Sequence, residues 1–147
     1  MQWQSILPGI WLFRDSCNVY AVRGARGMLI VNAGSGMWLD HLDGLPEHPK
    51  ALACTHYFRD HAAGALPASR AGIPLYVPAY ERAIFEEPAE PFRRRETYII
   101  YDNLWNLYAP IEGVPVAGEL LDYDTTDIAG VRVHVLPLPG ATMTQIG

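Results

Sequence analysis

The sequence gathers two imidazoles and one carboxylate in a single stretch, Cys54-Thr55-His56-Tyr57-Phe58-Arg59-Asp60-His61-Ala62-Ala63-Gly64. A short apolar run precedes this stretch and a helical pattern follows it, which predicts a strand, a loop and then a helix. His56, Asp60 and His61 fall within six positions of one another. These residue types bind zinc in proteins. The stretch therefore predicts a metal centre at the end of a buried strand.

The composition is typical of one globular domain, residues 1–147. Half of the residues are apolar and 18% are charged, which excludes a disordered chain. A chain of this length buries roughly 70% of its extended surface. The net charge of −5 argues against nucleic acid as a partner, because that partner needs a basic surface. One basic run, Arg93-Arg94-Arg95, is flanked by Glu90 and Glu96 and is expected to be a solvated loop rather than an anion site.

The cysteines and the apolar runs predict a cytoplasmic protein. Cys17 and Cys54 are far apart and form no C-x-x-C motif, so we expect buried free thiols in a reducing compartment. Residues 1–7 lack the basic and apolar regions of a signal peptide. No apolar run approaches the roughly 20 residues that cross a bilayer, so no membrane contact is expected.

Hydrophobic periodicity predicts strands alternating with helices. The Pro8-Gly9 pair divides residues 4–14 into two strands. Helices are expected at 37–45, 60–69 and 78–87. Further strands are expected at 17–22, 28–31, 51–54, 75–77, 118–122, 125–128 and 131–136. Strands and helices in this rhythm indicate a parallel βαβ layer, so the predicted class is α/β (α+β) with a mixed sheet flanked by helices.

The segment 88–110 has few regular signals and many aromatic residues. Its rings are those of Phe92, Tyr98, Tyr101, Trp105 and Tyr108. Three interpretations remain open. The residues 97–108 form a helical insertion, or the segment is a lid over a pocket, or it is a plain packing segment.

Several motifs in chain order resemble the metallo-β-lactamase superfamily. The central stretch is similar to the signature of this family, H-x-H-x-D-H. In the family two further residues and then a glycine follow the last histidine, as Ala62, Ala63 and Gly64 do here. Asn32-Ala33-Gly34 ends a buried strand where the family usually has Asp-x-Gly. Residues 124–133 match a hairpin that commonly precedes the family's P-G-H-T motif. An early N-x-Y pattern and the P-G-H-T motif itself correspond here to Asn18-Val19-Tyr20 and Pro139-Gly140-Ala141-Thr142. The resemblance covers nearly the whole chain.

The resemblance implies the first half of an αβ/βα sandwich with a hydrolytic zinc site. In such a site, zinc lowers the pKa of a bound water, and the resulting hydroxide attacks a carbonyl, phosphoryl or thioester centre. Asp60 would be the catalytic residue that orients this nucleophile or moves its proton. Substrates in the family include lactams, thioesters, lactones and nucleic acids, so the fold itself selects none of them.

The departures from the family pattern fall on its metal ligands. Phe58 stands in place of the second histidine of the signature, and Ala141 in place of the P-G-H histidine. The family's second ion is held by the positions of Asp60 and His61, with further ligands that would lie beyond Gly147. Asn32 replaces an aspartate that braces the motif loop. The candidate metal ligands are therefore His56, Asp60 and His61, for at most one zinc ion.

Three functions remain compatible with these replacements. The first is a non-catalytic protein in which the three residues form a hydrogen-bonded polar corner. The second is a one-zinc hydrolase completed by residues outside this chain, and the third is other chemistry on the same fold, such as iron-based redox. Other histidines, His41, His48 and His134, are expected to lie on the surface or on strands. A small molecule is the expected substrate if there is one.

The length predicts a partner for the sheet. Half of a sandwich leaves one apolar sheet face exposed, which favours association. We therefore expect either a piece of a longer protein, whose second half-domain covers this face, or a subunit that self-associates through it.

Overall fold

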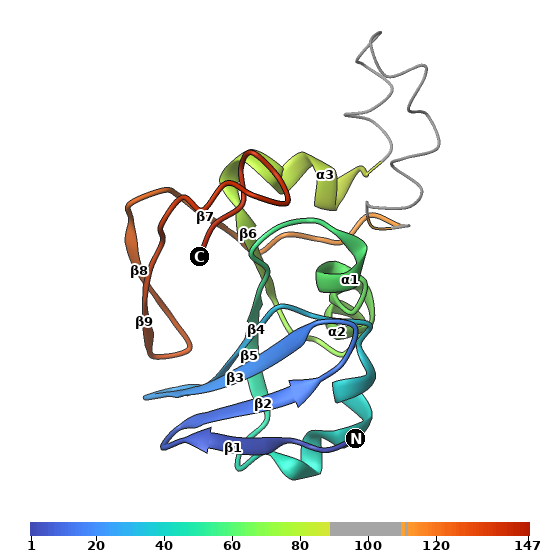
Figure 1. Ribbon diagram of the computed structural model, residues 1–147, viewed down its shortest axis with the longest axis vertical. Coiled ribbons are helices and arrows are strands. Elements are labelled where there is room, and N and C mark those ends of the chain that lie inside the picture. Colours follow the sequence, from blue (N-terminus) through green and yellow to red (C-terminus); the bar gives the residue numbers. More distant parts are fainter. Residues whose placement is uncertain (89–109, 111) are drawn as a thin grey trace, which may run out of the picture.

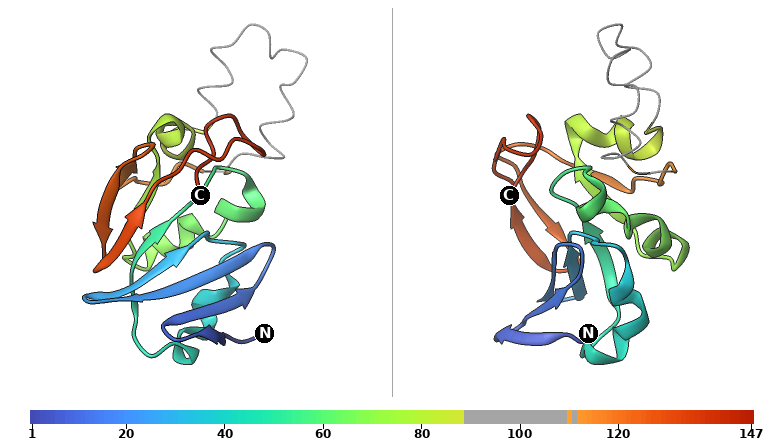
Figure 2. Two further views of the ribbon diagram at one scale, coloured as in Figure 1. Left: turned by 60° about the vertical axis from the view of Figure 1, so that its left-hand side comes forward. Right: turned by 45° about the vertical axis from the view of Figure 1, so that its right-hand side comes forward.

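The chain folds into three layers, with a mixed sheet between a group of short helices and a β-hairpin (Figures 1 and 2). The computed structural model describes residues 1–88, 110 and 112–147. The basic run at 93–95 and the three alternatives for 97–108 lie outside these residues and stay predictions.

The central sheet has seven strands in the order in which they occur along the chain. The first to the fourth strand pair antiparallel with their neighbours. The fourth to the seventh strand pair parallel, as the βαβ pattern predicts. Pro8 and Gly9 separate the first two strands, as expected. The strands are β1 (Gln4–Leu7), β2 (Ile10–Arg14), β3 (Asn18–Gly24), β4 (Gly27–Val31), β5 (Pro49–Ala53), β6 (Leu75–Pro78) and β7 (Gly118–Leu120).

The helices are shorter and more broken than the sequence predicts. The expected helix at 37–45 is the 3-10 helix η1 (Met37–Gly44), kinked at His41. The expected helix at 60–69 is two helices, α1 (Arg59–Ala62) and α2 (Ala65–Arg70). Between them the N–H of Gly64 donates to the carbonyl of Gly34 at 2.8 Å instead of within a helix. A β-carbon on Gly64 would lie 2.3 Å from the carbonyl oxygen of Ala33, so glycine is needed for this close approach. The expected helix at 78–87 is η2 (Ala79–Glu81) followed by α3 (Arg82–Glu86).

The two faces of the sheet have separate apolar clusters. The helix-covered face contains large buried side chains, among them Phe13, Trp38 and Phe85, which have no exposed surface. Full burial of one such side chain contributes roughly 1.5–3 kcal/mol. The opposite face has a smaller cluster that includes Leu29, Ala53 and Ile146. The main core therefore lies between the sheet and the helices.

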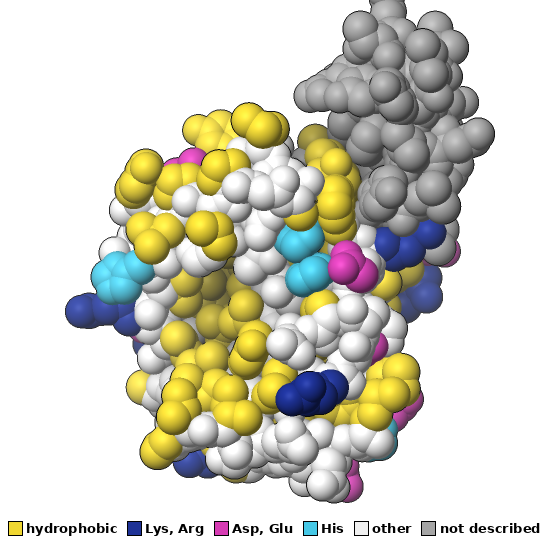
Figure 3. Space-filling view, viewed as in Figure 1, with side chains coloured by type: hydrophobic (Ala, Val, Ile, Leu, Met, Phe, Trp, Pro, Cys, Tyr) yellow, Lys and Arg dark blue, Asp and Glu magenta, His cyan; other side chains and the backbone are white. Residues whose placement is uncertain are grey.

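The hairpin of β8 (Thr125–Ile128) and β9 (Val131–His134) covers part of the second face. Its tip is fixed to the β3–β4 turn, where the backbone N–H groups of Ala25 and Arg26 donate to Gly130 and Ala129. Arg26 also forms an ion pair with Asp127. In Figure 3 apolar side chains line a hollow on this face, between the hairpin and the sheet. The expected strands at 118–122 and 131–136 end two residues early.

Two smaller expectations concern the thiols and the membrane. Cys17 and Cys54 are both free, but only Cys54 is buried, whereas Cys17 is partly exposed. Within the described residues, no helix has both the length and the apolar character needed to cross a bilayer.

Candidate metal centre

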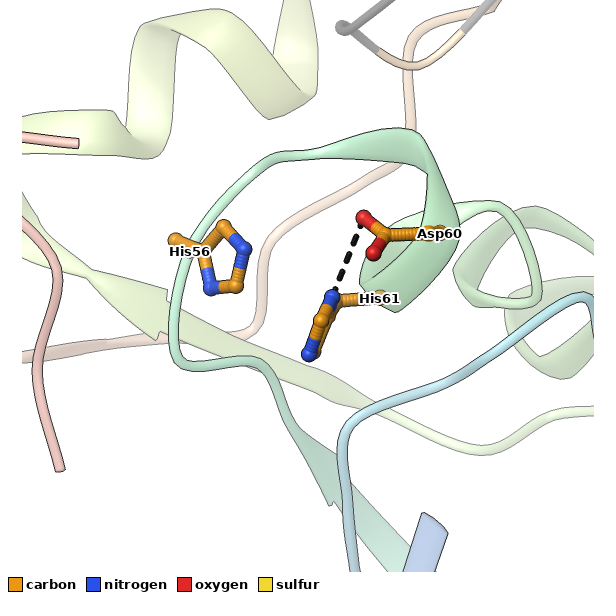
Figure 4. Close-up of side chains that lie close together, drawn as sticks. All are labelled: His56, Asp60 and His61. Carbon is orange, nitrogen blue, oxygen red and sulfur yellow. Dashed lines mark ion pairs between the residues drawn. The ribbon is translucent and has the colours of Figure 1, made fainter. Parts of the chain in front are cut away.

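The predicted ligands lie where the parallel strand β5 leads into α1. His56 belongs to the loop after β5, and Asp60 and His61 belong to α1 (Figure 4). The loop is bound to its neighbours, because the N–H of Cys54 donates to Tyr76 at 3.0 Å. Ser16 also donates its hydroxyl to the carbonyl oxygen of Asp60 at 2.6 Å. The carboxyl end of a parallel sheet is the usual place for a ligand site.

The structure brings His56, Asp60 and His61 together, as the sequence predicts. One donor atom from each residue lies within 4.8 Å of the others. The two imidazole rings face each other at a centroid distance of 4.4 Å. Among the residues that the structure describes, this is the one group of three such side chains that converges. The arrangement fits the three protein ligands of a mononuclear zinc site.

A chain of hydrogen bonds determines which ring nitrogen of His56 carries the proton. The hydroxyl of Thr55 donates to Oδ1 of Asn32 at 3.0 Å. That hydroxyl lies 2.9 Å from Nδ1 of His56. Because its single proton is already used, Nδ1 of His56 is the donor in this second bond. The other ring nitrogen, Nε2, is therefore left unprotonated as a potential metal ligand.

The surroundings keep His56 neutral. Its side chain is buried, with 3% exposed. Burial, followed by the nearby imidazole of His61, lowers the pKa of His56 to about 4, while Asp60 acts in the opposite direction. Burial has this effect because it disfavours the charged form of a histidine. At neutral pH the ring is thus in the form that binds a metal ion.

One ring nitrogen of His61, Nδ1, lies beside Asp60 without a normal hydrogen bond. Its Nδ1 lies 3.0 Å from Oδ1 of Asp60, which is an ion-pair distance. Even so, Nδ1 is buried and makes no hydrogen bond of normal geometry among the described residues. A buried polar atom without a partner is costly. The donor set therefore fits a metal ion, which would be held by His56, Asp60 and His61.

The two replaced ligand positions offer no metal donor. The ring of Phe58 packs edge-on against His56 at a centroid distance of 5.3 Å. Ala141 lies exposed in the C-terminal segment, here defined as residues 137–147. Its N–H donates to Oε1 of Gln145 at 3.0 Å. Neither residue adds a ligand to the group of three.

Two tertiary contacts support the site, and the sequence indicates only the first. Asn32 occupies the position that braces the motif loop in the family, and its Oδ1 accepts from both the N–H and the hydroxyl of Thr55, each at 3.0 Å. Asn32 has a φ of 63°, a conformation that asparagine tolerates. The C-terminal segment is the second support, because the N–H of Ile146 donates to the carbonyl of Thr55 at 3.0 Å.

The remaining histidines lie apart from this group. His48 is exposed, and His134 lies on β9 beside Thr125 at 2.8 Å. His41 packs on Phe13 with a centroid distance of 5.5 Å. The positions of His48 and His134 agree with the prediction, whereas His41 is half-buried in η1 instead of lying on the surface or on a strand.

The fold is that of the metallo-β-lactamases. No family model and no curated protein matches this sequence, but solved structures do. A metallo-β-lactamase with an HARLDQ motif from Cronobacter sakazakii matches with a TM-score of 0.76 and 17% identity, over 99% of this chain and 58% of that chain. BJP-1, a subclass B3 enzyme of Bradyrhizobium japonicum, has a TM-score of 0.72 and 16% identity, over 99% and 55%. FEZ-1 from Legionella gormanii has a TM-score of 0.73 and 15% identity, over 99% and 56%.

The chain thus spans somewhat more than half the length of these structures, in agreement with the expected first half of the fold. The HARLDQ motif of the Cronobacter sakazakii protein also departs from H-x-H-x-D-H. It has arginine at the third place, where this chain has Phe58, and glutamine at the sixth, where this chain keeps His61. A similar fold thus exists with a different set of replacements in the same motif.

Proposed function

We propose that this chain is a metallo-β-lactamase-fold protein with an impaired metal site. It holds at most one zinc ion, on His56, Asp60 and His61, and turns over no substrate by itself. The observation that carries the proposal is the Phe58 ring packed against His56. An aromatic hydrocarbon ring supplies no ligand, and it stands where the resemblance implies a histidine ligand of the family's first ion.

The three remaining residues define what the site can do. A zinc ion bound there would act as a Lewis acid and activate water. His56 would bind through Nε2, because its Nδ1 is committed to Thr55. Asp60 is about half exposed at its side chain, so its carboxylate is accessible to water. It is the residue placed to orient a nucleophile or accept its proton.

A second candidate function is a one-zinc hydrolase of esters, thioesters, lactones or lactams. The convergence of three donor atoms within 4.8 Å favours it, since catalytic zinc sites have three protein ligands and one open position. An apolar hollow of about 290 Å³ begins at Cys54 and Thr55, next to His56, and would suit the apolar part of a small substrate. Residues outside this chain would complete the site.

Metal content is the test that separates these functions. The protein is purified without a metal-affinity column, dialysed and measured by elemental analysis, with His61→Ala as a matched variant. About one equivalent of zinc without hydrolysis of ester, thioester, lactone or lactam probes supports the impaired site. Chelator-sensitive hydrolysis supports the second function instead. No zinc in either protein refutes the metal part of the proposal and leaves a polar corner held by hydrogen bonds.

We also propose that the second face of the sheet pairs with a second half-domain or with another copy of the chain. The rows Ile10–Val22–Leu29 and Leu12–Tyr20–Val31 share this face by their strand register. Ile10, Tyr20, Val22 and Val31 are only partly buried, so apolar surface remains uncovered. Light scattering on a size-exclusion column tests this. A sharp monomer peak at micromolar concentration, together with a cooperative melt, would contradict both forms of pairing.

A cytoplasmic location is part of the same proposal. The two free cysteines support it, because reducing compartments keep thiols unpaired. Fractionation of the native source, with a thiol-trapping reagent, checks the location and the redox state together.

A further inference from the structure

A fully buried carboxylate lies outside the group of metal-binding side chains. Glu81 ends η2 and has 0% of its surface exposed. Burial raises the pKa of its carboxyl group. Glutamate is almost never fully buried without partners, and no cation pairs with Glu81 within the described part of the chain. The burial therefore requires an explanation from its neutral neighbours.

The partners of Glu81 come from the C-terminal segment. The hydroxyl of Thr142 donates to Oε1 at 2.5 Å, and the hydroxyl of Thr144 donates to the same oxygen at 2.9 Å. The backbone N–H of Tyr57 also faces the carboxylate and favours its charged form. No described donor reaches the other oxygen, Oε2, in hydrogen-bonding geometry. Oε1 of Glu81 thus accepts hydrogen bonds from two residues of the C-terminal segment.

These contacts join the two segments that border the candidate metal centre. Tyr57 directly follows His56, and Thr142 directly follows Ala141, the residue in place of the family's third histidine. A further link between the two segments is the hydrogen bond from Ile146 to Thr55. We propose that Glu81 is a positioning residue, which fixes the C-terminal segment against the loop that carries His56 by accepting the hydrogen bonds of Thr142 and Thr144.

The size of the effect follows from the kind of bond. Thr142 and Thr144 share one acceptor oxygen, and the loss of hydrogen bonds inside a protein is costly for a charged or a neutral carboxyl group. We expect removal of Glu81 to raise local opening of the C-terminal segment by about tenfold or more. Any effect on zinc affinity rests on the proposed function, whereas the fixing of the segment does not.

Hydrogen exchange of the metal-free protein is the direct experiment. The reporters are the N–H groups of Leu138, Gly140 and Ile146, which are hydrogen-bonded to Gln145, Thr142 and Thr55. Glu81→Ala should speed their exchange by about tenfold or more and leave the amides of β4 and β5 unchanged. Glu86→Ala is the matched control, because Glu86 is an exposed neighbour paired with Arg82 at 2.9 Å, and it should change none of the reporters.

Conservative variants keep the proposal testable if Glu81→Ala does not fold. Thr142→Val and Thr144→Val keep the side-chain shape and remove the donors, so each should speed exchange at the same reporters. Thr142→Ser, Thr144→Ser and Glu81→Gln keep the donors or an acceptor and should retain most of the protection. The nitrogen shifts of the His56 ring should move in Glu81→Ala and in the valine variants but not in the serine variants.

Two outcomes would overturn the proposal. The first is unchanged exchange in both valine variants. The second is a uniform rise in exchange over β4, β5 and the C-terminal segment in all variants, because Glu81 would then act as a general core residue. Zinc content is measured in parallel. If the wild-type protein binds no zinc but the reporters respond as expected, the metal-binding part of the proposed function fails and Glu81 remains a positioning residue.

Discussion

The loop at 54–61 and the C-terminal segment at 137–147 border the same site but differ in chemistry. The loop and the start of α1 supply His56, Asp60 and His61, with donor atoms within 4.8 Å of one another. The C-terminal segment has Ala141 at the position where the resemblance implies a histidine, and it supplies no ligand. One border of the site carries the candidate metal ligands, and the other carries none.

Both segments are nevertheless held firmly in place. Asn32 supports the loop through two hydrogen bonds to Thr55, and Glu81 supports the C-terminal segment through Thr142 and Thr144. The supporting residues do not include any of the three candidate ligands. The comparison teaches that the residues that support this site are different residues from its candidate ligands.

The largest expected effect comes from removing a ligand from the loop. His61→Ala leaves two ligands where zinc sites need three or four, so the affinity for zinc should fall by about 100-fold or more. Isothermal titration with zinc measures the change. His48→Ala is the control, because His48 is exposed and distant in sequence from the group. Equal zinc affinity in the wild type and in His61→Ala would show that the ion binds elsewhere.

The next largest effect is a gain in zinc content, obtained by giving both segments histidine ligands. The double variant Phe58→His and Ala141→His adds two imidazoles while the supports at Asn32 and Glu81 stay intact. Zinc content should rise above that of the wild type, toward two equivalents, and Phe58→His alone should give a smaller rise. Elemental analysis of dialysed protein provides the count. No gain in the double variant would mean that the C-terminal segment is not positioned to supply a ligand.

The support of the loop gives a smaller effect, measured as stability. Asn32→Ala removes the acceptor of two hydrogen bonds from Thr55, so the free energy of unfolding should fall by about 1–3 kcal/mol. Alanine at a φ of 63° adds a cost of about 1–2 kcal/mol. Asn32→Asp keeps the acceptor and should be nearly as stable as the wild type. Urea denaturation of the three proteins gives the ranking, and an unaffected Asn32→Ala would exclude this support.

The smallest expected effect is a pH dependence that comes from Glu81. Its pKa is raised above the ordinary 4.5, so folding favours the protonated carboxyl group. The stability from this group is fully present below about pH 4.5 and is lost as the pH rises through the folded-state pKa. The groups that face it are the thiol of Cys54, the hydroxyls of Thr142 and Thr144, and the N–H of Tyr57.

Melting temperatures across the pH range measure this contribution. Glu81→Gln cannot titrate at this position, so the melting temperature of the wild type relative to Glu81→Gln should fall by a few degrees between pH 4 and pH 8. Glu86→Gln repeats the experiment at an exposed carboxylate and should show no such trend. A constant difference between wild type and Glu81→Gln would mean that Glu81 keeps one protonation state throughout.

The sequence allows the strands and the ligand group to be predicted because both follow local patterns. Continuous apolar runs indicate β4 and β5, and the motif places His56, Asp60 and His61 at the end of β5. The break between α1 and α2 could not be predicted, because the N–H of Gly64 donates to Gly34, which comes from another part of the chain. Nor could the role of Glu81, since an isolated glutamate in a helical segment usually faces solvent.

The contact between the β3–β4 turn and the tip of the β8–β9 hairpin affects how the chain reaches its fold. Arg26 and Asp127 are 101 residues apart in sequence. Closing a loop of that length costs chain entropy before the contact can repay it, so such contacts form late and slow folding. During synthesis, β4 and β5 emerge well before the hairpin, with Leu29 and Ala53 still uncovered. Docking of the hairpin therefore ends the interval in which this nascent chain is most prone to aggregate.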